Sequence, residues 1–417
     1  MVAEVRVATE HDGVQWRRAL GLGFLSVPAE DDEHLEAWHA TYEPGRFLGA
    51  FDGERCVGTL RSYAYQLTVP GGAPVPADGF AGITVSPTHR RQGLLRQMAQ
   101  LELARAVERG DAVALLTASE HPIYGRFGFG RAARWGGWRI DVVRSGGLRP
   151  GAGELAPGAA VEVLDPHDLL HVGPELHERF RTVQPGALSR SERTWTALTG
   201  DPAFPGRPRH PRPFVVVHRD AGGEVTGLLV FSADAEFHGG DPDATLTVLD
   251  HLALDPASAA ALWRFALSVD WVRHVHVPHA APDDALPLLL VNPRAASPVL
   301  DPSDDLWLRL LDGPAAFAAR TYEAPGRSVL EVDDPQGLVG GRWALDTAAD
   351  GTGRFSRTDD PAELALGVDV LGAAYLGGGN VQQCADAGLA TELVPGAAAR
   401  LHRQLRTTLA PWCPDRF

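Results

Sequence analysis

Three residues between a strand-like and a helix-like segment have the types and spacing of a phosphate-binding turn. Residues 83–95 read ITVSPTHRRQGLL: Pro87 ends an apolar strand, and Arg90, Arg91 and Gly93 lie where the next helix begins. The first N–H groups of a helix lack partners inside it and bind phosphate oxygens. Gly93 has no side chain to block that approach, and the two arginines add charge-assisted hydrogen bonds. The segment therefore predicts a pyrophosphate cradle.

This segment and two others resemble one enzyme family. Residues 83–98, ITVSPTHRRQGLLRQM, resemble the acetyl-CoA-binding motif of the Gcn5-related N-acetyltransferase (GNAT) superfamily, Arg/Gln-x-x-Gly-x-Gly/Ala, from which Leu95 departs at the last position. Residues 118–130, ASEHPIYGRFGFG, are similar to a segment typical of the enhanced intracellular survival (Eis) acetyltransferases, and residues 410–417, APWCPDRF, resemble the end of those proteins. The similarity extends over the full length of the chain.

The resemblance implies roles for individual residues. Tyr124 would protonate the leaving CoA sulfur, and the terminal carboxylate of Phe417 would remove the amine proton. Without the resemblance, Tyr124 would be a half-buried aromatic residue and Phe417 a frayed end. Strand amides of Ile83 and Val85 would contact the thioester carbonyl and pantetheine. The residues expected at the acetyl-CoA site are Ile83, Thr84, Val85, Arg90, Arg91, Gln92, Gly93, Leu94, Leu95, Ser119 and Glu120.

Four residues near the start of the chain are candidates for substrate binding. Phe24 and Trp38 match positions that line the substrate cleft in the family, although core packing would explain them equally simply. Glu30 and Asp32 belong to an acidic run after Pro28. Such acids can attract a cationic substrate or merely complement the dipole of a helix that begins there.

The expected reaction is acetyl transfer from acetyl-CoA to a primary amine. The acceptor would be a polycationic small molecule of aminoglycoside type or a peptide lysine. Direct attack in a ternary complex is expected, since no Cys or Ser is placed to take the acetyl group. The alternative is an apolar-ligand-binding or assembly protein with a vestigial GNAT unit. The intact Arg90, Arg91 and Gly93 favour the enzyme.

The surrounding pattern predicts the elements that position these residues. Residues 46–51, 56–68, 79–85 and 112–118 read as strands, and 93–108 as a helix. A Pro/Gly-rich linker at 145–158 is followed by a fainter repeat with strands 214–219, 225–233 and 244–254 and a helix at 258–269. The repeat lacks the Arg and Gly residues of the cradle, so the second copy is expected to be degenerate.

From about residue 299 onward the sequence pattern changes. It predicts short strands at 328–332, 341–346 and 353–357 and helices at 304–311, 360–371 and 396–405. The expected fold class is α/β and α+β: tandem GNAT folds, the N-terminal one active and the central one degenerate, plus the sterol-carrier-protein-like C-terminal domain that the resemblance implies. The predicted boundaries are 1–145 for the catalytic domain, 146–295 for the degenerate GNAT-like domain and 296–417 for the last domain.

Composition narrows the classes of partner. The 417 residues carry a formal net charge of −15, which argues against nucleic acid and favours a cationic partner. All 38 basic residues are arginine, so every cationic contact to CoA must come from arginine. No apolar stretch suggests membrane insertion or a signal peptide. Three distant cysteines, Cys56, Cys384 and Cys413, indicate a reducing cytoplasm.

A metal site is not expected, although His274, His276 and His279 lie close together on one strand-like segment. Neither a cysteine nor an acidic residue joins them in the sequence, and they fall in the degenerate repeat. The family resemblance also implies a homohexamer, for which nothing in the composition argues.

Overall fold

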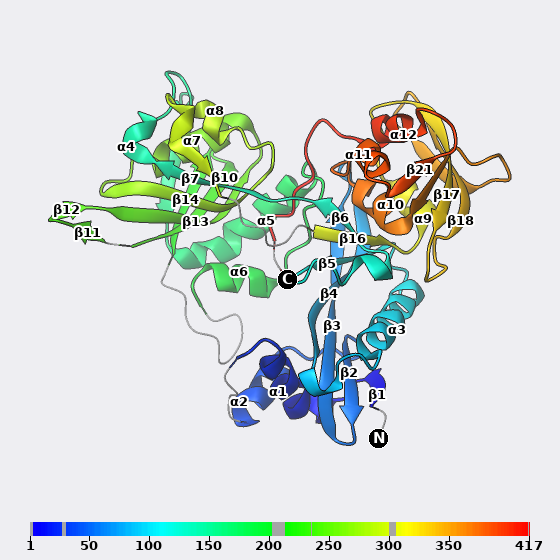
Figure 1. Cartoon of the computed structure of the whole chain (residues 1–417). Coiled ribbons are helices and arrows are strands. Elements are labelled where there is room, and N and C mark those ends of the chain that lie inside the picture. The colour runs from blue at the N-terminus through cyan, green and yellow to red at the C-terminus, as the bar shows by residue number, and fades with distance from the viewer. Residues whose placement is uncertain (1–2, 27–30, 202–212, 235, 300–305, 416) are drawn as a thin grey trace.

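Three units with separate sheets make up the chain (Figure 1). The computed structural model describes residues 3–26, 31–201, 213–234, 236–299, 306–415 and 417. This is the predicted combination of α/β and α+β architecture. In the described part of the chain, every helix is too short or too polar to cross a lipid bilayer. The three cysteines are free thiols.

The first unit is built on a seven-stranded sheet of order β1-β2-β3-β4-β5-β16-β6, in which only β4 and β5 pair in parallel. Its strands are β1 (Glu4–Val7), β2 (Phe47–Asp52), β3 (Arg55–Thr68), β4 (Pro74–Val85), β5 (Val113–Thr117), β6 (Gly130–Ala133) and β16 (Leu306–Leu310). Its helices are α1 (Gly13–Gly23), α2 (Asp31–His39) and α3 (Leu94–Glu108). The predicted helix at 93–108 is therefore confirmed.

The second unit repeats this topology. Strands β9, β10, β13 and β14 follow one another as β2 to β5 do, again with only the last pair parallel. The strands are β7 (Gly136–Asp141), β8 (Ala160–Leu164), β9 (Phe214–Arg219), β10 (Val225–Ala233), β13 (Ala244–Ala253), β14 (Val272–Ala280) and β15 (Ala296–Pro298), with a small hairpin of β11 (Phe237–His238) and β12 (Asp241–Pro242). The helices are α4 (Val142–Ser145), α5 (Leu169–Arg181), α6 (Glu192–Leu198), α7 (Pro256–Ala266) and α8 (Leu286–Leu289).

The third unit packs four helices on a five-stranded sheet of order β19-β18-β17-β20-β21. The strands are β17 (Gly326–Asp333), β18 (Gly341–Thr347), β19 (Gly353–Arg357), β20 (Leu364–Gly367) and β21 (Ala390–Glu392). The helices are α9 (Gly313–Ala319), α10 (Val368–Tyr375), α11 (Val381–Asp386) and α12 (Ala397–Leu405).

The sheets exchange strands along the chain. β7 pairs with β14 of the second sheet, although it lies within the first 145 residues. β16 enters the first sheet between β5 and β6, although it follows residue 296. In Figure 1, β16 accordingly lies beside β5 and β6. The first sheet therefore depends on a strand contributed from the C-terminal third of the chain.

Two predicted helices of the last segment are wrong. Residues 306–310 form β16 rather than part of a helix, and residues 304 and 305 lie outside the described residues. Leu306, Leu308 and Leu310 alternate with Trp307 and Arg309, and all five are buried between two strands. A run this short and apolar fits a strand or a helix equally well by its pattern. The predicted helix at 360–371 is divided between β20 and α10.

Candidate active site

The predicted strand amides lie where two parallel strands stop pairing. β4 and β5 pair from Ala77 opposite Val113 to Phe80 opposite Leu116. Beyond Phe80, β4 continues to Val85 and stays paired only with β3. A register shift between these two strands includes Ile83, in the manner of the bulges that often lie next to active sites. The end of β4 thus has one edge that β5 leaves uncovered.

Val85 directs its N–H group to that edge. Ser86 donates its N–H to the Val57 carbonyl at 2.7 Å, which is on the β3 side. Because successive N–H groups alternate between the two sides of a strand, that of Val85 points to the β5 side. The Thr84 side chain is buried and its hydroxyl lies 2.8 Å from that of Thr59, so Thr84 offers only backbone to the edge.

The predicted cradle has left-handed backbone at two positions. After the turn Pro87–His89, Arg91 has φ +64° and Gly93 has φ +79°. Gly93 is the N-cap of α3 and provides no side chain to accept from the helix N–H groups. The first N–H groups of α3 are thus left without a capping acceptor from Gly93, and such groups bind anions. The first turn of α3 therefore has donors available.

The side chains around this turn divide into exposed cations and buried anchors. Arg90, Arg91 and Gln92 are exposed, and within the described residues neither arginine has an ion-pair partner. Leu94 is buried and Leu95 packs against the same core cluster. The departure of Leu95 from Gly or Ala is thus accommodated because its side chain faces inward.

The corresponding turn in the second unit is blocked. There α7 has Asp255 as N-cap, and its carboxylate accepts from the N–H groups of Ala257 and Ser258 at 2.9 Å each. A carboxylate from the chain itself thus holds the place that an anion would occupy. Loss of the cradle in this copy, expected from the sequence, therefore has a direct structural counterpart.

Tyr124 lies in the loop that follows β5. Its carbonyl accepts the N–H of Phe127 at 3.0 Å, which closes a short helical turn. Its half-buried ring lies 6.4 Å from the ring of Phe129 and 6.5 Å from that of Trp307 on β16. The inserted strand thus supports the tyrosine. Ser119 and Glu120 are exposed earlier in the same loop.

The last residue of the chain docks at the end of β5. One terminal carboxylate oxygen of Phe417 accepts a hydrogen bond from the Thr117 hydroxyl at 3.3 Å. The Phe417 ring lies 5.0 Å from that of Tyr65. A Cβ atom at Gly79 would meet both rings, at 2.6 Å for Tyr65 and 3.0 Å for Phe417, so glycine is required beneath them. The carboxylate is thereby placed on the strand that leads to Tyr124.

Sequence reasoning missed Tyr65 and Thr117. Burial raises the pKa of Tyr65 well above its usual range, so its hydroxyl is neutral. Neither residue belongs to a motif, and each contributes only because the chain end lies against it. No local signal in the sequence could have identified them.

The predicted substrate residues differ in their exposure to solvent. Phe24 is 53% exposed, and Asp32 is exposed in the first turn of α2, while the neighbouring Asp31 pairs with Arg18 at 2.5 Å. Glu30 lies outside the described residues.

Trp38 requires a correction, because its side chain is fully buried. It packs against Tyr42 and Phe47, with ring centroids 4.7 Å apart in each case, and against Trp16. A side chain with no accessible surface stabilises this region without lining a cleft. Core packing, the simpler alternative, accounts for Trp38.

The histidines at 274, 276 and 279 alternate on β14 without converging on a metal site. Across the described ranges, no group of three or more His, Cys, Asp or Glu residues could hold a metal ion.

Comparisons with known proteins agree with the three units. Residues 4–132 and 186–321 match two acetyltransferase (GNAT) domain families, and residues 314–414 match a sterol carrier protein domain family. An uncharacterized N-acetyltransferase of Streptomyces griseus is 44% identical over all of both chains. The N-acetyltransferase Eis of Mycobacterium tuberculosis is 35% identical over 79% of this chain and 78% of its own length. The crystal structure of Eis1 from Mycobacterium abscessus superposes with a TM-score of 0.82 and 30% identity, covering 99% of this chain and all of that one.

Proposed function

The chain belongs to the Eis family of GNAT N-acetyltransferases, and on that premise we propose that it transfers the acetyl group of acetyl-CoA directly to a primary amine. The observation that carries the proposal is the contact of the Phe417 carboxylate with Thr117 at the end of β5. This contact supports the proposal because it holds a candidate base at the end of β5, the strand that precedes the loop with Tyr124. No cysteine or serine needs to carry the acetyl group in this arrangement.

The residues at the split between β4 and β5 suit acetyl-CoA. The left-handed turn at Arg91 and Gly93 would hold its pyrophosphate with backbone N–H groups, assisted by the guanidinium groups of Arg90 and Arg91. The N–H of Val85 would hydrogen-bond along the uncovered edge of β4. When bound, acetyl-CoA supplies a thioester whose carbonyl carbon forms the new bond to nitrogen as the C–S bond breaks.

Two groups of the chain would move the protons. The Phe417 carboxylate would take a proton from the incoming ammonium group, since a primary amine with a pKa of about 10.4 is almost wholly protonated at neutral pH. The Tyr124 hydroxyl would give a proton to the departing sulfur. The nitrogen would lose two protons on the way from ammonium to amide. The first would end on the Phe417 carboxylate, and the second, lost once the C–N bond has formed, would restore the Tyr124 phenol after that hydroxyl has protonated the sulfur, so that the products are the amide, the CoA thiol and one proton.

The proposed acceptor is a polycationic small molecule of aminoglycoside type or a peptide lysine. The net charge of −15 and the exposed acids that begin α2 favour a cation. From the family resemblance we also propose that the chain forms a homohexamer in the cytoplasm. The alternative of an apolar-ligand carrier would place its ligand in the third unit, whose core includes the buried side chains of Phe317, Trp343, Phe355 and Tyr375.

One extra residue tests the proposal. Adding a single glycine after Phe417 moves the terminal carboxylate away from Thr117, and kcat in a thiol-release assay with a panel of amines should fall by about 10²-fold. Acetyl-CoA affinity should stay within about twofold, because the cradle is untouched. The matched control carries the same glycine after Met1. Full activity of the C-terminally extended chain would show that the carboxylate is not the base.

A further inference from the structure

The second unit holds the tail that ends at Phe417. Gln184 donates its side-chain amide to the Ala410 carbonyl at 3.1 Å, and the N–H of Trp412 donates to the Pro185 carbonyl at 2.8 Å. The Trp412 side chain packs in the core cluster of the second unit, with its ring 6.3 Å from that of Phe180. The segment just before the chain end therefore belongs structurally to the copy that has lost its cradle.

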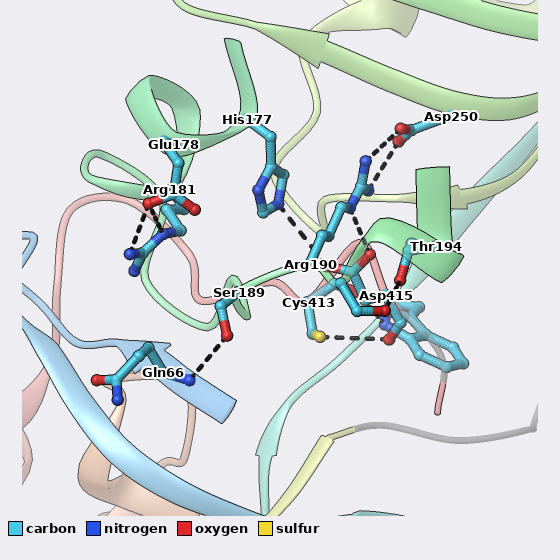
Figure 2. A network of polar contacts seen from close by, with 12 residues as sticks. Gln66, His177, Glu178, Arg181, Ser189, Arg190, Thr194, Asp250, Cys413 and Asp415 are labelled. Atoms are coloured by element: carbon cyan, nitrogen blue, oxygen red, sulfur yellow. Dashed lines mark hydrogen bonds and ion pairs between the residues drawn. The ribbon is translucent and has the colours of Figure 1, made fainter. Parts of the chain in front are cut away.

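The strongest of these contacts is an arginine between two aspartates (Figure 2). The Arg190 Nε atom lies 2.7 Å from Asp415 Oδ1, and its Nη1 atom lies 2.6 Å from Asp250 Oδ2. The side chains of Arg190, Asp250 and Asp415 are 3%, 5% and 14% exposed, respectively. Because solvent is excluded, these charge-assisted bonds are stronger and more directional than surface ion pairs.

Arg190 is itself fixed to the first sheet. Residues 186–189 pair alongside the end of β3. The Thr68 N–H donates to the Ala187 carbonyl at 2.9 Å, and Ser189 exchanges two hydrogen bonds of 3.0 Å each with Gln66. Figure 2 shows Gln66 and Ser189 next to the arginine network. Tyr65, whose ring contacts that of Phe417, directly precedes Gln66. Hydrogen bonds between residues 186–189 and β3 thus connect Arg190 to the strand on which the Phe417 ring lies.

The other side of Asp415 is also built to hold the tail. His177 is buried, and its Nε2 atom lies 4.0 Å from Asp415 Oδ2. Burial lowers the pKa of His177 to about 2, so the imidazole is neutral and Arg190 supplies the positive charge. The Cys413 carbonyl accepts the indole N–H of Trp135 at 2.8 Å, and the Asp415 carbonyl accepts the Cys413 thiol at 3.3 Å. These contacts order the backbone as far as residue 415.

We propose that Arg190, oriented by Asp250, is a positioning residue that holds the Phe417 carboxylate at the reaction centre through Asp415. The inference rests on the proposed role of that carboxylate. Phe417 is the second residue after Asp415, and free termini are the least ordered parts of most chains. A base is effective only when it is held within hydrogen-bond reach of its proton. The degenerate unit therefore has a function of its own, which is to anchor the base that the first unit uses.

Two substitutions test this role. We call the ion pair between Arg190 and Asp415 the clamp. Asp415→Asn keeps the side-chain shape but removes the charge that Arg190 binds, and Arg190→Gln removes the guanidinium group of the clamp. Each should lower kcat by about 10²-fold, as expected for a base misplaced by about 1 Å, while KM for acetyl-CoA changes less than about twofold. The matched control is Arg327→Gln, because Arg327 also bridges two aspartates, Asp346 at 2.6 Å and Asp360 at 2.5 Å, on the surface of the third unit. This control should retain wild-type kcat.

A second measurement reports positioning without relying on catalysis. Carboxypeptidase should release Phe417 about tenfold faster or more from Asp415→Asn than from wild type or the Arg327→Gln control, since loss of a charge-assisted hydrogen bond frees the tail. Unchanged release together with unchanged kcat would overturn the clamp. If Arg190→Gln fails to fold, Asp415→Asn alone decides.

The extended chain separates the two proposals. If the added glycine leaves kcat intact, the terminal-base proposal fails whatever the clamp variants do. If the extension lowers kcat but Asp415→Asn changes neither kcat nor release of Phe417, only the clamp fails. In the extended background, Asp415→Asn should cause no further loss of kcat, because its effect passes through the carboxylate; a further loss would contradict a positioning role.

Discussion

The Thr117 hydroxyl donates a hydrogen bond of 3.3 Å to the terminal carboxylate of Phe417, 300 residues later in the chain. Thr117 ends β5, and the loop that follows carries Tyr124. One strand end therefore has the candidate base beside it and leads to the candidate acid. Neither group reaches this place through its own unit alone: β16 supports Tyr124 through Trp307, and the second unit holds the tail.

Replacing Tyr124 with Phe should lower kcat with little change in acetyl-CoA binding. The substitution removes the proton donor for the departing sulfur but keeps the ring between Phe129 and Trp307. We expect a loss of about 10²-fold or more in kcat, and a dissociation constant for acetyl-CoA within about twofold, measured by calorimetry. Tyr42→Phe, which removes a hydroxyl that donates to the Ala8 carbonyl at 3.3 Å, should keep wild-type kcat. An unchanged kcat for Tyr124→Phe would refute the acid role.

Replacing Gly93 with Ala should raise KM for acetyl-CoA. The new methyl group forces a side chain into left-handed backbone, at a cost of roughly 1–2 kcal/mol, and lies beside the donors of the cradle. Gly110→Ala is the control: it follows the other end of α3, has φ +81°, and its Cβ would meet nothing within 4 Å. Both variants should lose a similar amount of stability in denaturation, but only Gly93→Ala should weaken the binding of acetyl-CoA. Equal KM values would contradict the cradle.

A buried charge cluster behind the cradle predicts how stability varies with pH. Asp78 lies 2.6 Å from Arg46 and 3.0 Å from Arg109, which also binds Glu102 at 2.7 Å. Both carboxyl side chains are fully buried. Burial first, and the nearby Glu102 second, raise the pKa of Asp78 to about 8. The folded chain thus binds a proton there that the unfolded chain, with a pKa of about 3.9, releases.

The contribution of Asp78 to the free energy of unfolding should therefore fall as pH rises from about 4 toward about 8 and stay constant above that range. Buried His177, neutral in the folded chain, contributes in the opposite direction up to about pH 6.5, so the fall due to Asp78 is best seen above that pH. Asp78→Asn, which resembles the protonated acid, should remove this fall, measured by urea denaturation between about pH 6.5 and 8. Glu331→Gln, at an exposed pair with Arg342, should leave the slope unchanged. A wild-type slope retained in Asp78→Asn would show that another group titrates.

Truncating Asp334 should strongly destabilise the chain. Arg309 of β16 contacts both Asp334 oxygens at 2.7 Å, and both side chains are fully buried. Asp334→Ala leaves the guanidinium unpaired, and we expect a loss of about 3–5 kcal/mol in the free energy of unfolding. As a control, Asp346→Ala removes one partner of the exposed pair with Arg327, and it should lower the free energy of unfolding by less than about 1 kcal/mol.

Adding Arg309→Met to Asp334→Ala should recover part of that loss, because an apolar side chain needs no partner in the core. Calorimetric unfolding of the two single variants and the double variant measures the difference. If the double variant is less stable than Asp334→Ala, the unpaired charge is not the cause.

Local chemistry explains what could be predicted. The cradle at Arg90, Arg91 and Gly93 lies in consecutive residues, and the need for glycine at a left-handed N-cap is a property of its own backbone. The helix at 93–108 and the duplicated strands follow from periodicity within single segments. The burial of Trp38 and the inward orientation of Leu95 were harder to predict from the sequence, because burial depends on which element packs against a side chain.

The sequence by itself determined the family and the fold class and predicted the pyrophosphate cradle, because these depend on residues that are neighbours along the chain. Only the tertiary structure decided that residues 306–310 complete the first sheet, that Arg190 binds Asp415 and Asp250, and that Thr117 and Tyr65 receive Phe417. Strand pairing and buried ion pairs join residues far apart in sequence, so no local pattern records them. The proposed active site depends on such contacts, since its base is the last residue of the chain.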